Sequence, residues 1–229
     1  MRLRQRISHY CQHHQDGLIV AIYFLILLFV TSAAPEIREN IAFAQEILLL
    51  IFLISLLFSL RRSLFRPMPL EYVGKAVLWG ILALFLEFIV IAIGFLVTKV
   101  TVPSNNTARV IALIKQNYFY FGYSIVIAPL VEELVFRQSF FNLVHRMLNK
   151  FAGKHKHVLV KRDHIIIWFT SAFVTAVIFA GLHADNEVWE YILISFFLQW
   201  LYYHYQDIRV CQIAHISFNL GTLALLFFA

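Results

Sequence analysis

The sequence predicts an all-α membrane protein, a polytopic bundle of about seven transmembrane helices with its N-terminus inside. Of its 229 residues, 61% are hydrophobic and only 14% are charged, whereas a soluble domain carries about 25% charged residues. So few charges could not cover a water-soluble protein of this size. The composition therefore excludes a soluble enzyme, a nucleic-acid-binding domain and a disordered chain. The lipid bilayer is the expected environment, and no nucleic-acid partner is expected.

Seven apolar runs are candidates for crossing a bilayer, which takes about 20 helical residues. They lack the alternation of barrel strands, and a backbone in lipid must satisfy its own hydrogen bonds. The fourth run is longer than one crossing needs, so that helix is tilted or extends past the membrane. The runs are residues 17–34, 41–60, 76–97, 118–147, 165–183, 188–205 and 210–228.

The positive charges give the orientation. Most of the 19 Lys and Arg residues fall in segments that face inside when the N-terminus is inside, as the positive-inside rule requires. The first run ends in the small residues Thr31-Ser32-Ala33-Ala34, which would also suit a signal-peptide cleavage site, so it is either a span or a leader. We divide the chain into residues 1–117, with the first three helices, and 118–229, with the last four, inside one integral domain.

Three charged residues lie close together in the fourth run, where ionisable groups are costly and mark functional sites. Glu133 and Arg137 are four residues apart and can form an ion pair on one helix face. Glu132 lies about 100° further round the helix. A carboxylate without a partner in a partly dry cavity is a candidate general base. A buried network that joins helices is the structural alternative.

Two histidines occur in comparable pairs. Phe179 and His183 end the fifth run on one helix face, with Gly181 between them allowing a neighbouring backbone to come close. His215 and Asn219 have the same spacing in the last run, and two donors on one face suit a developing oxyanion. Either pair could instead simply link helices by hydrogen bonds.

Together, the patterns Glu-Glu-x-x-x-Arg, Phe-x-x-x-His and His-x-x-x-Asn, in this order, resemble the CPBP family. That family comprises CAAX proteases and bacteriocin-processing or immunity proteins, also called Abi, and includes the type II CAAX prenyl endopeptidases. The resemblance covers about half of the chain, from Tyr118 to the C-terminus. The first three runs match only as generic membrane helices.

The resemblance implies an intramembrane endopeptidase that hydrolyses a peptide bond in a membrane-embedded or lipid-anchored peptide or protein tail. Carried over to this chain, Glu132 and His183 would hold and deprotonate the attacking water, and His215 and Asn219 would stabilise the oxyanion. Three further residues would support the helices that present these groups: Glu133, Arg137 and Phe179.

The resemblance leaves the cofactor open, because the family has been described both as metalloproteases and as metal-free, glutamate-dependent proteases. Glu132, His183 and His215 are suitable zinc ligands with one open position. Against zinc, the sequence has no His-Glu-x-x-His motif. We therefore expect either a divalent metal such as zinc or no cofactor.

The predicted topology constrains how these groups meet. With the N-terminus inside, His183 lies at the outer end of its helix and His215 lies nearer the inner face. The groups converge only if the turn at residues 184–187 is recessed into a water-filled cavity, where irregular backbone is tolerated. We expect such a recessed turn.

Two other functions are compatible with the residues. One is a non-catalytic membrane immunity or peptide-binding protein of the same fold. The other is a transporter or proton relay that uses Glu87 of the third run together with Glu132 and Glu133. Glu87 is otherwise expected to be a hydrogen-bonded carboxyl, with Arg137 as an alternative partner. The small chain suits a bacterial cell membrane better than a eukaryotic endomembrane, and nothing indicates its oligomeric state.

Overall fold

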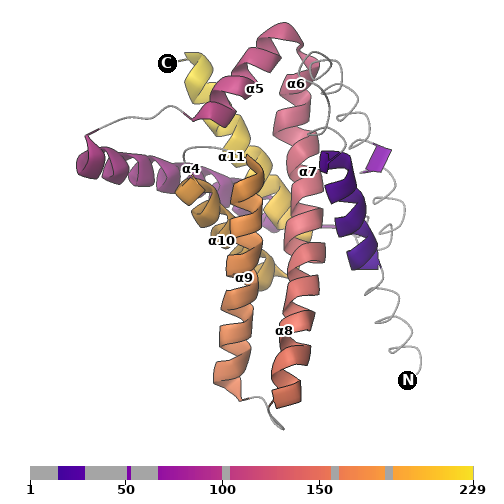
Figure 1. Cartoon of the computed structure of the whole chain (residues 1–229). Coiled ribbons are helices and arrows are strands. Elements are labelled where there is room, and N and C mark those ends of the chain that lie inside the picture. Colours follow the sequence, from indigo (N-terminus) through magenta and orange to yellow (C-terminus); the bar gives the residue numbers. More distant parts are fainter. Residues whose placement is uncertain are drawn as a thin grey trace. The chain divides into compact units, whose positions relative to one another are not determined.

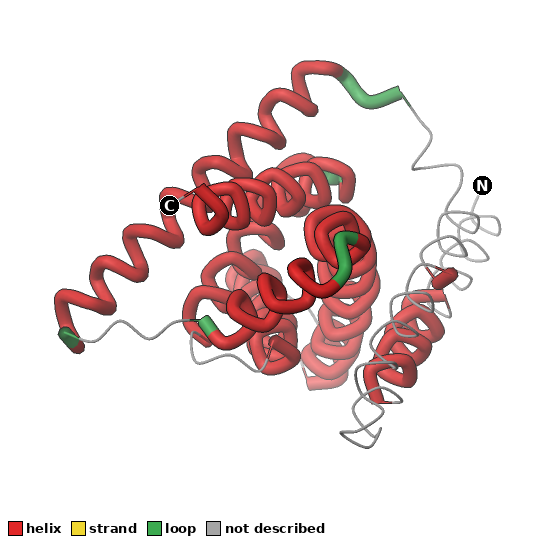
Figure 2. Tube along the Cα trace, turned by 90° about the horizontal axis from the view of Figure 1, so that it is seen from above, coloured by secondary structure: helices red, strands yellow, loops and turns green. Residues whose placement is uncertain are grey.

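The computed structural model describes residues 15–28, 51–52, 67–99, 104–155, 160–183 and 188–228. The regular elements in these ranges are helices, as Figure 2 shows, which confirms the all-α prediction. The chain divides into two compact units. Unit 1 contains Met1–Ser59 and Leu134–Thr175, and unit 2 contains Leu60–Glu133 and Ala176–Ala229. The division into residues 1–117 and 118–229 stays a prediction.

Three of the described helices are long and apolar enough to cross a bilayer: Leu70–Val97, Phe119–Lys154 and Lys161–His183. They correspond to the predicted runs 76–97, 118–147 and 165–183. The protein is therefore an integral membrane protein built from helices. The predicted count of seven spans is not settled, because run 41–60 and the end of run 17–34 lie largely outside the described residues.

The last two predicted runs are also helices, α10 (Val188–Tyr205) and α11 (Ile208–Phe228). Neither is among the three helices that qualify as spans by length and apolar composition. Helix α11 carries Gln212, His215 and Asn219 in its middle, and these polar side chains lower its apolar character. Such residues in a membrane helix face protein partners rather than lipid.

Unit 1 is held together by aromatic and ionic contacts between separate segments. Helix Gln15–Leu28 places Tyr23 edge-on against Phe136, with ring centroids 5.6 Å apart. Asp16, near its start, forms an ion pair with Arg146 of α8 (Phe141–His155) at 2.7 Å. The first part of α9 (Lys161–His183) begins beside Asp163, whose carboxylate accepts from the Val160 N–H at 3.0 Å.

In unit 2, α4 (Leu70–Thr98) crosses α11, and both helices can be followed in Figure 1. The crossing is closest at Gly80, where an added Cβ would lie 2.4 Å from the Ala214 carbonyl oxygen and 2.6 Å from Ser217 Cβ. Small residues let membrane helices approach in this way. Phe85 and Ile89, on another face of α4, are exposed, as lipid-facing side chains should be.

Helix α5 (Asn105–Gln116) begins at Ser104, whose hydroxyl accepts from the Thr107 N–H at 3.0 Å. Its apolar face is buried in unit 2, where Ile114 forms a small core cluster with Ile125 and Leu223. The sequence of α5 therefore has both an N-cap residue, Ser104, and an apolar face that includes Ile114. The start of α5 lies close to the start of α10, where Asn106 Nδ2 donates to the Tyr191 hydroxyl.

The fourth predicted run is a continuous helical stretch of 36 residues, Phe119–Lys154. At about 1.5 Å per residue this exceeds the bilayer core of about 30 Å, so the stretch must tilt or extend past the hydrocarbon. It consists of α6 (Phe119–Gly122), η1 (Tyr123–Ile127), α7 (Ala128–Glu132), η2 (Glu133–Phe140) and α8. The elements η1 and η2 are π-helical.

Pro129 explains the first π-helical segment. A proline inside a helix has no N–H to donate, and its ring clashes with the carbonyl four residues back, here that of Ile125. Widening the preceding turn relieves this clash. In agreement, the Ala128 N–H donates to the carbonyl of Tyr123, five residues back, rather than to that of Ser124.

Candidate active site

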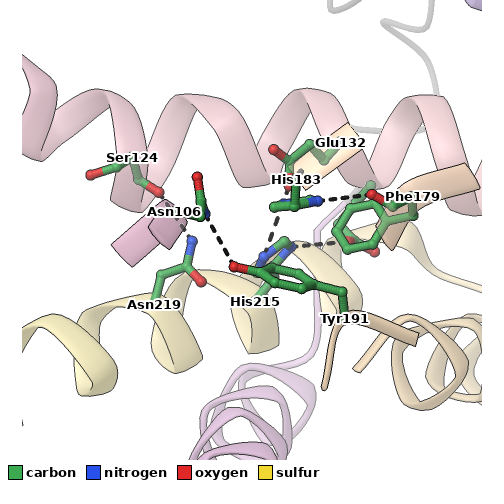
Figure 3. A network of polar contacts seen from close by, with 9 residues as sticks. Asn106, Ser124, Glu132, Phe179, His183, Tyr191, His215 and Asn219 are labelled. Atoms are coloured by element: carbon green, nitrogen blue, oxygen red, sulfur yellow. Dashed lines mark hydrogen bonds and ion pairs between the residues drawn. The ribbon is translucent and has the colours of Figure 1, made fainter. Parts of the chain in front are cut away.

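The polar side chains of α11 contact the helical stretch that carries the two adjacent glutamates. Gln212, His215 and Asn219 follow one another at spacings of three and four residues and so share one helix face. Gln212 Nε2 donates to the Leu130 carbonyl at 3.1 Å. His215 and Asn219 reach the same stretch, and Figure 3 shows the network that they form with it.

His215 lies between the two glutamates. Its Nδ1 is 2.9 Å from Oε1 of Glu133, and its Nε2 is 4.0 Å from Oε2 of Glu132. Glu133 is completely buried and His215 is 5% exposed. An ionised carboxylate can only accept, so Nδ1 is the donor to Glu133, which fixes the ring plane and aims Nε2 at Glu132.

The two glutamates differ in environment although they are neighbours in sequence. The side chain of Glu132 keeps 19% of its surface exposed, whereas that of Glu133 has none exposed. Glu132 ends α7 and Glu133 begins η2, so the helix changes its register between them. The buried carboxylate orients the imidazole, and the partly exposed one is accessible to a reactant.

His183 is positioned by its own helix and by α10. Its Nδ1 lies 2.8 Å from the Phe179 carbonyl oxygen, which can only accept, so this nitrogen carries a proton. In the neutral ring the lone pair is then on Nε2. The ring stacks on Tyr191, with centroids 4.2 Å apart and planes at 26°, and it packs against the Phe179 ring at 4.5 Å. Phe179 is 1% exposed.

Asn219 donates from Nδ2 to the Ser124 carbonyl at 3.0 Å. Because the partner is a carbonyl, the nitrogen of the amide must face it. The second amide hydrogen is then directed elsewhere. The close-up of Figure 3 shows Asn219 and His215 on successive turns of α11.

The remaining residues predicted from the sequence are placed as follows. Arg137 is completely buried in η2, and its ion pair with Glu133 stays a prediction. Gly181 has nothing near it that an added Cβ would meet, so the expected close approach of a backbone there is wrong among the described residues. The turn at residues 184–187, expected to be recessed, lies outside the described ranges.

Glu87 of α4 is half-buried and accepts from the Thr222 hydroxyl of α11 at 3.4 Å. This contact agrees with the expectation of a hydrogen-bonded carboxyl at the helix crossing. Thr222 lies three residues after Asn219, on the same stripe of α11.

Sequence reasoning missed two residues of the network. Tyr191 of α10 stacks on His183, and its hydroxyl accepts from Asn106 Nδ2 of α5 at 3.2 Å. No local pattern marks either residue, since Tyr191 lies in an aromatic-rich run and Asn106 in the first turn of a surface helix. Only the fold brings them to His183.

Within the described ranges, no group of three or more His, Cys, Asp or Glu side chains is arranged to hold a metal ion. The candidate set of Glu132, His183 and His215 therefore does not form a ready ligand cage here. Glu133 contacts Nδ1 of His215 and leaves Nε2 as the ring nitrogen that could bind a metal, as in metal sites whose histidines donate to a carboxylate. The choice between a divalent metal and no cofactor stays a prediction.

A comparison with known protein families finds a match over part of the chain. Residues 114–221 match a family model described as "Type II CAAX prenyl endopeptidase Rce1-like". The resemblance drawn from the three motifs is thereby confirmed, and the matched segment contains all of them.

The chain is also similar to a relative whose name describes a membrane peptidase. The chain is 24% identical over 217 residues to the Bacillus subtilis (strain 168) protein named "Putative membrane peptidase YdiL", and the match covers 90% of this chain and 81% of the relative. No solved structure matches the chain.

Proposed function

We propose that the protein is an intramembrane endopeptidase that hydrolyses a peptide bond in a membrane-embedded or lipid-anchored peptide through a water activated by Glu132. The observation that supports this most is the placement of His215, with Nδ1 on the buried Glu133 and Nε2 directed at Glu132. A partly exposed carboxylate facing a fixed imidazole is an arrangement for moving a proton to and from a reactant.

Each residue then has a defined step. Glu132, with His183 Nε2 accepting a hydrogen bond from the same water, removes a proton as the water oxygen attacks the peptide carbonyl carbon. The carbonyl oxygen becomes an oxyanion, which a doubly protonated His215 and the second amide hydrogen of Asn219 stabilise. Glu132 returns the proton to the leaving nitrogen, and the C–N bond breaks to give a carboxylic acid and an amine; the acid then loses its remaining proton to the amine or to water.

The buried partner of His215 has a matching role. A doubly protonated ring is costly in a site with little water, and the ionised Glu133 carboxylate at 2.9 Å balances its charge. Glu133 thus does for His215 what a buried aspartate does in a catalytic triad: it holds the ring and stabilises its charged form.

The experiment uses the purified protein in liposomes of phosphatidylethanolamine and phosphatidylglycerol, a composition chosen for a bacterial cell membrane. The probe is an internally quenched peptide with a farnesylated cysteine three residues from its C-terminus, and the same peptide without the lipid is assayed beside it. Glu132→Gln should lower turnover by at least about 100-fold. The control is Glu71→Gln, an exposed glutamate paired with Lys75 at the start of α4.

A second arm covers substrates that the probe does not resemble. New N-termini in the membrane proteome of host cells are compared between cells that express the wild type and cells that express Glu132→Gln at equal levels. Sites cleaved with the wild type and absent with the variant support proteolysis. Undiminished cleavage of the probe by Glu132→Gln would refute the role of Glu132 as the base. No cleavage of the probe by the wild type, together with no difference between the two proteomes, would favour the non-catalytic peptide-binding alternative.

A further inference from the structure

The Ser124 carbonyl is deprived of its ordinary backbone donors by the sequence itself. In an α-helix the N–H four residues on would reach it, but the Ala128 N–H donates to Tyr123 instead. In a π-helix the donor would come five residues on, and that residue is Pro129, which has no N–H. A carbonyl within the membrane needs a donor from elsewhere.

That donor is Asn219, whose Nδ2 lies 3.0 Å from the Ser124 oxygen. The bond joins α11 to η1 at a point one turn from His215. It also fixes which end of the amide faces the helix, because an amide oxygen in that place would meet the carbonyl oxygen. The orientation of the Asn219 amide therefore follows from the backbone N–H that is missing at Pro129.

We propose that Pro129 is a positioning residue for Asn219. By removing the backbone donor from the Ser124 carbonyl, it leaves this carbonyl as the fixed acceptor that holds the Asn219 amide beside His215. The consequence for catalysis rests on the proposed function, whereas the coupling between Pro129 and Asn219 is a property of the folded protein alone.

The variant Pro129→Ala provides the test, because either helical register then supplies a backbone donor. If the turn returns to an α-helix, the Ala128 N–H reaches Ser124; if it stays π-helical, the new N–H at position 129 does. In both cases Asn219 is no longer required by this carbonyl. The effect of removing Asn219 should thus depend on whether residue 129 is proline.

The experiment is a double-mutant cycle on the thermal unfolding of the full-length protein in detergent micelles. In the wild-type background, Asn219→Ala should lower Tm by about 2–6 °C, as expected for a partly buried acceptor that loses its donor. In the Pro129→Ala background the same change should lower Tm by less than about 1 °C. Equal losses in the two backgrounds would overturn the proposal.

Gln212 gives a matched control. It also donates a side-chain amide from α11 to the same stretch, but its acceptor, the Leu130 carbonyl, already receives the Glu133 N–H. Gln212→Ala should therefore cost the same in both backgrounds. If Asn219→Ala alone does not accumulate, its recovery in the Pro129→Ala background counts as the coupling, and continued failure counts against it.

Activity is measured separately on the farnesylated probe. Pro129→Ala should lower kcat by about 10- to 100-fold with little change in KM, because a misplaced donor affects the transition state more than binding. Adding Asn219→Ala should lower kcat by less than a further twofold.

A non-additive Tm cycle in a protein that cleaves nothing would refute the proposed function and leave the Pro129–Asn219 coupling intact. An unchanged kcat in Pro129→Ala, with an active wild type, would refute the catalytic consequence.

Discussion

His215 Nδ1 lies 2.9 Å from Glu133 Oε1, and Glu133 is completely buried. The two residues are 82 positions apart in the sequence, on helices that meet in unit 2. This bond selects the outward nitrogen of the ring, Nε2, as the one that faces Glu132. In the proposed mechanism it is the contact on which the charged form of His215 depends.

The first prediction concerns that contact. Glu133→Gln keeps the size of the side chain and removes its charge, so kcat should fall by about 100-fold or more while KM changes by less than about threefold. The measurement is turnover of the farnesylated probe at equal amounts of folded protein. Wild-type kcat in this variant would show that the charge on Glu133 is not needed.

A second substitution at Glu133 distinguishes the effect of its charge from the effect of its packing. Glu133→Ala leaves His215 without its acceptor and opens space in a buried site, so it should also lower the unfolding free energy, by about 3–5 kcal/mol. The control Glu71→Gln, on an exposed glutamate, should change neither quantity measurably. Equal stability of Glu133→Ala and the wild type would contradict the buried contact.

The second prediction concerns Tyr191, which stacks on His183 and accepts from Asn106. Tyr191→Phe keeps the ring and loses the hydroxyl, so kcat should fall by less than about fivefold. Tyr191→Ala removes the stacked surface and should lower kcat by at least about tenfold, because an imidazole that is free to turn is less often in its productive orientation.

Asn106 provides the check on that interpretation. If its only role is to hold the Tyr191 hydroxyl, Asn106→Ala should match Tyr191→Phe in kcat, and the double variant should be no worse than either single change. Additive losses would mean that Asn106 acts on the site by another route.

The fold was largely predictable because the apolar runs are bounded by polar turns. Helix α10 has the predicted limits, and α9 ends at His183 as predicted but begins at Lys161 rather than Ile165. The earlier start follows from Asp163, which accepts from the Val160 N–H. An apolar run shows where a span must be, whereas a helix continues into the polar interface for as long as it is capped.

The sequence predicts some of the contacts between the candidate residues and misses others. Spacing of four residues put His215 and Asn219 on one face, and both do bond to the same helical stretch. The sequence does not predict that Glu133 contacts His215, because helical spacing indicates only that Glu133 can pair with Arg137. Local spacing reports only on neighbours within one helix; the pairing of Glu133 with α11 depends on how helices pack. The π-helical turn at η1 could have been predicted from the sequence, because Pro129 lies inside an apolar helical run.

The third prediction is a pH dependence outside the membrane-spanning segments. Asp207, in the turn before α11, forms an ion pair with Arg209 at 2.6 Å, and its Oδ1 accepts from the Arg209 N–H at 3.1 Å. The hydrogen bonds from the Arg209 side chain lower the pKa of Asp207 below the ordinary value of 3.8. A depressed pKa stabilises the folded state above the ordinary pKa, and this contribution is lost as the pH falls through the folded-state pKa.

Accordingly, the Asp207 contribution to Tm should be constant between pH 7 and pH 5 and should decline below about pH 4. Asp207→Asn should have a lower Tm than the wild type at pH 7, and the difference should shrink as the pH is lowered below 4. The difference between the two Tm curves is the quantity to follow, since other carboxylates titrate in both proteins. A constant difference down to pH 2 would exclude this ion pair as its origin.

The last prediction concerns the crossing of α4 and α11, which sets the position of the helix that carries His215. At Gly80 an added Cβ would lie 2.4 Å from the Ala214 carbonyl oxygen and 2.6 Å from Ser217 Cβ. Gly80→Ala must therefore separate the two helices, and it should lower the unfolding free energy by about 1–3 kcal/mol. Gly74 and Gly94 lie in the same helix with nothing within 4 Å of an added Cβ. Their alanine variants should match or exceed the wild-type stability, because alanine favours a helix over glycine by about 1 kcal/mol. Thermal or denaturant unfolding of the three variants in one detergent decides the matter, and equal stability of all three would show that the crossing does not need a glycine.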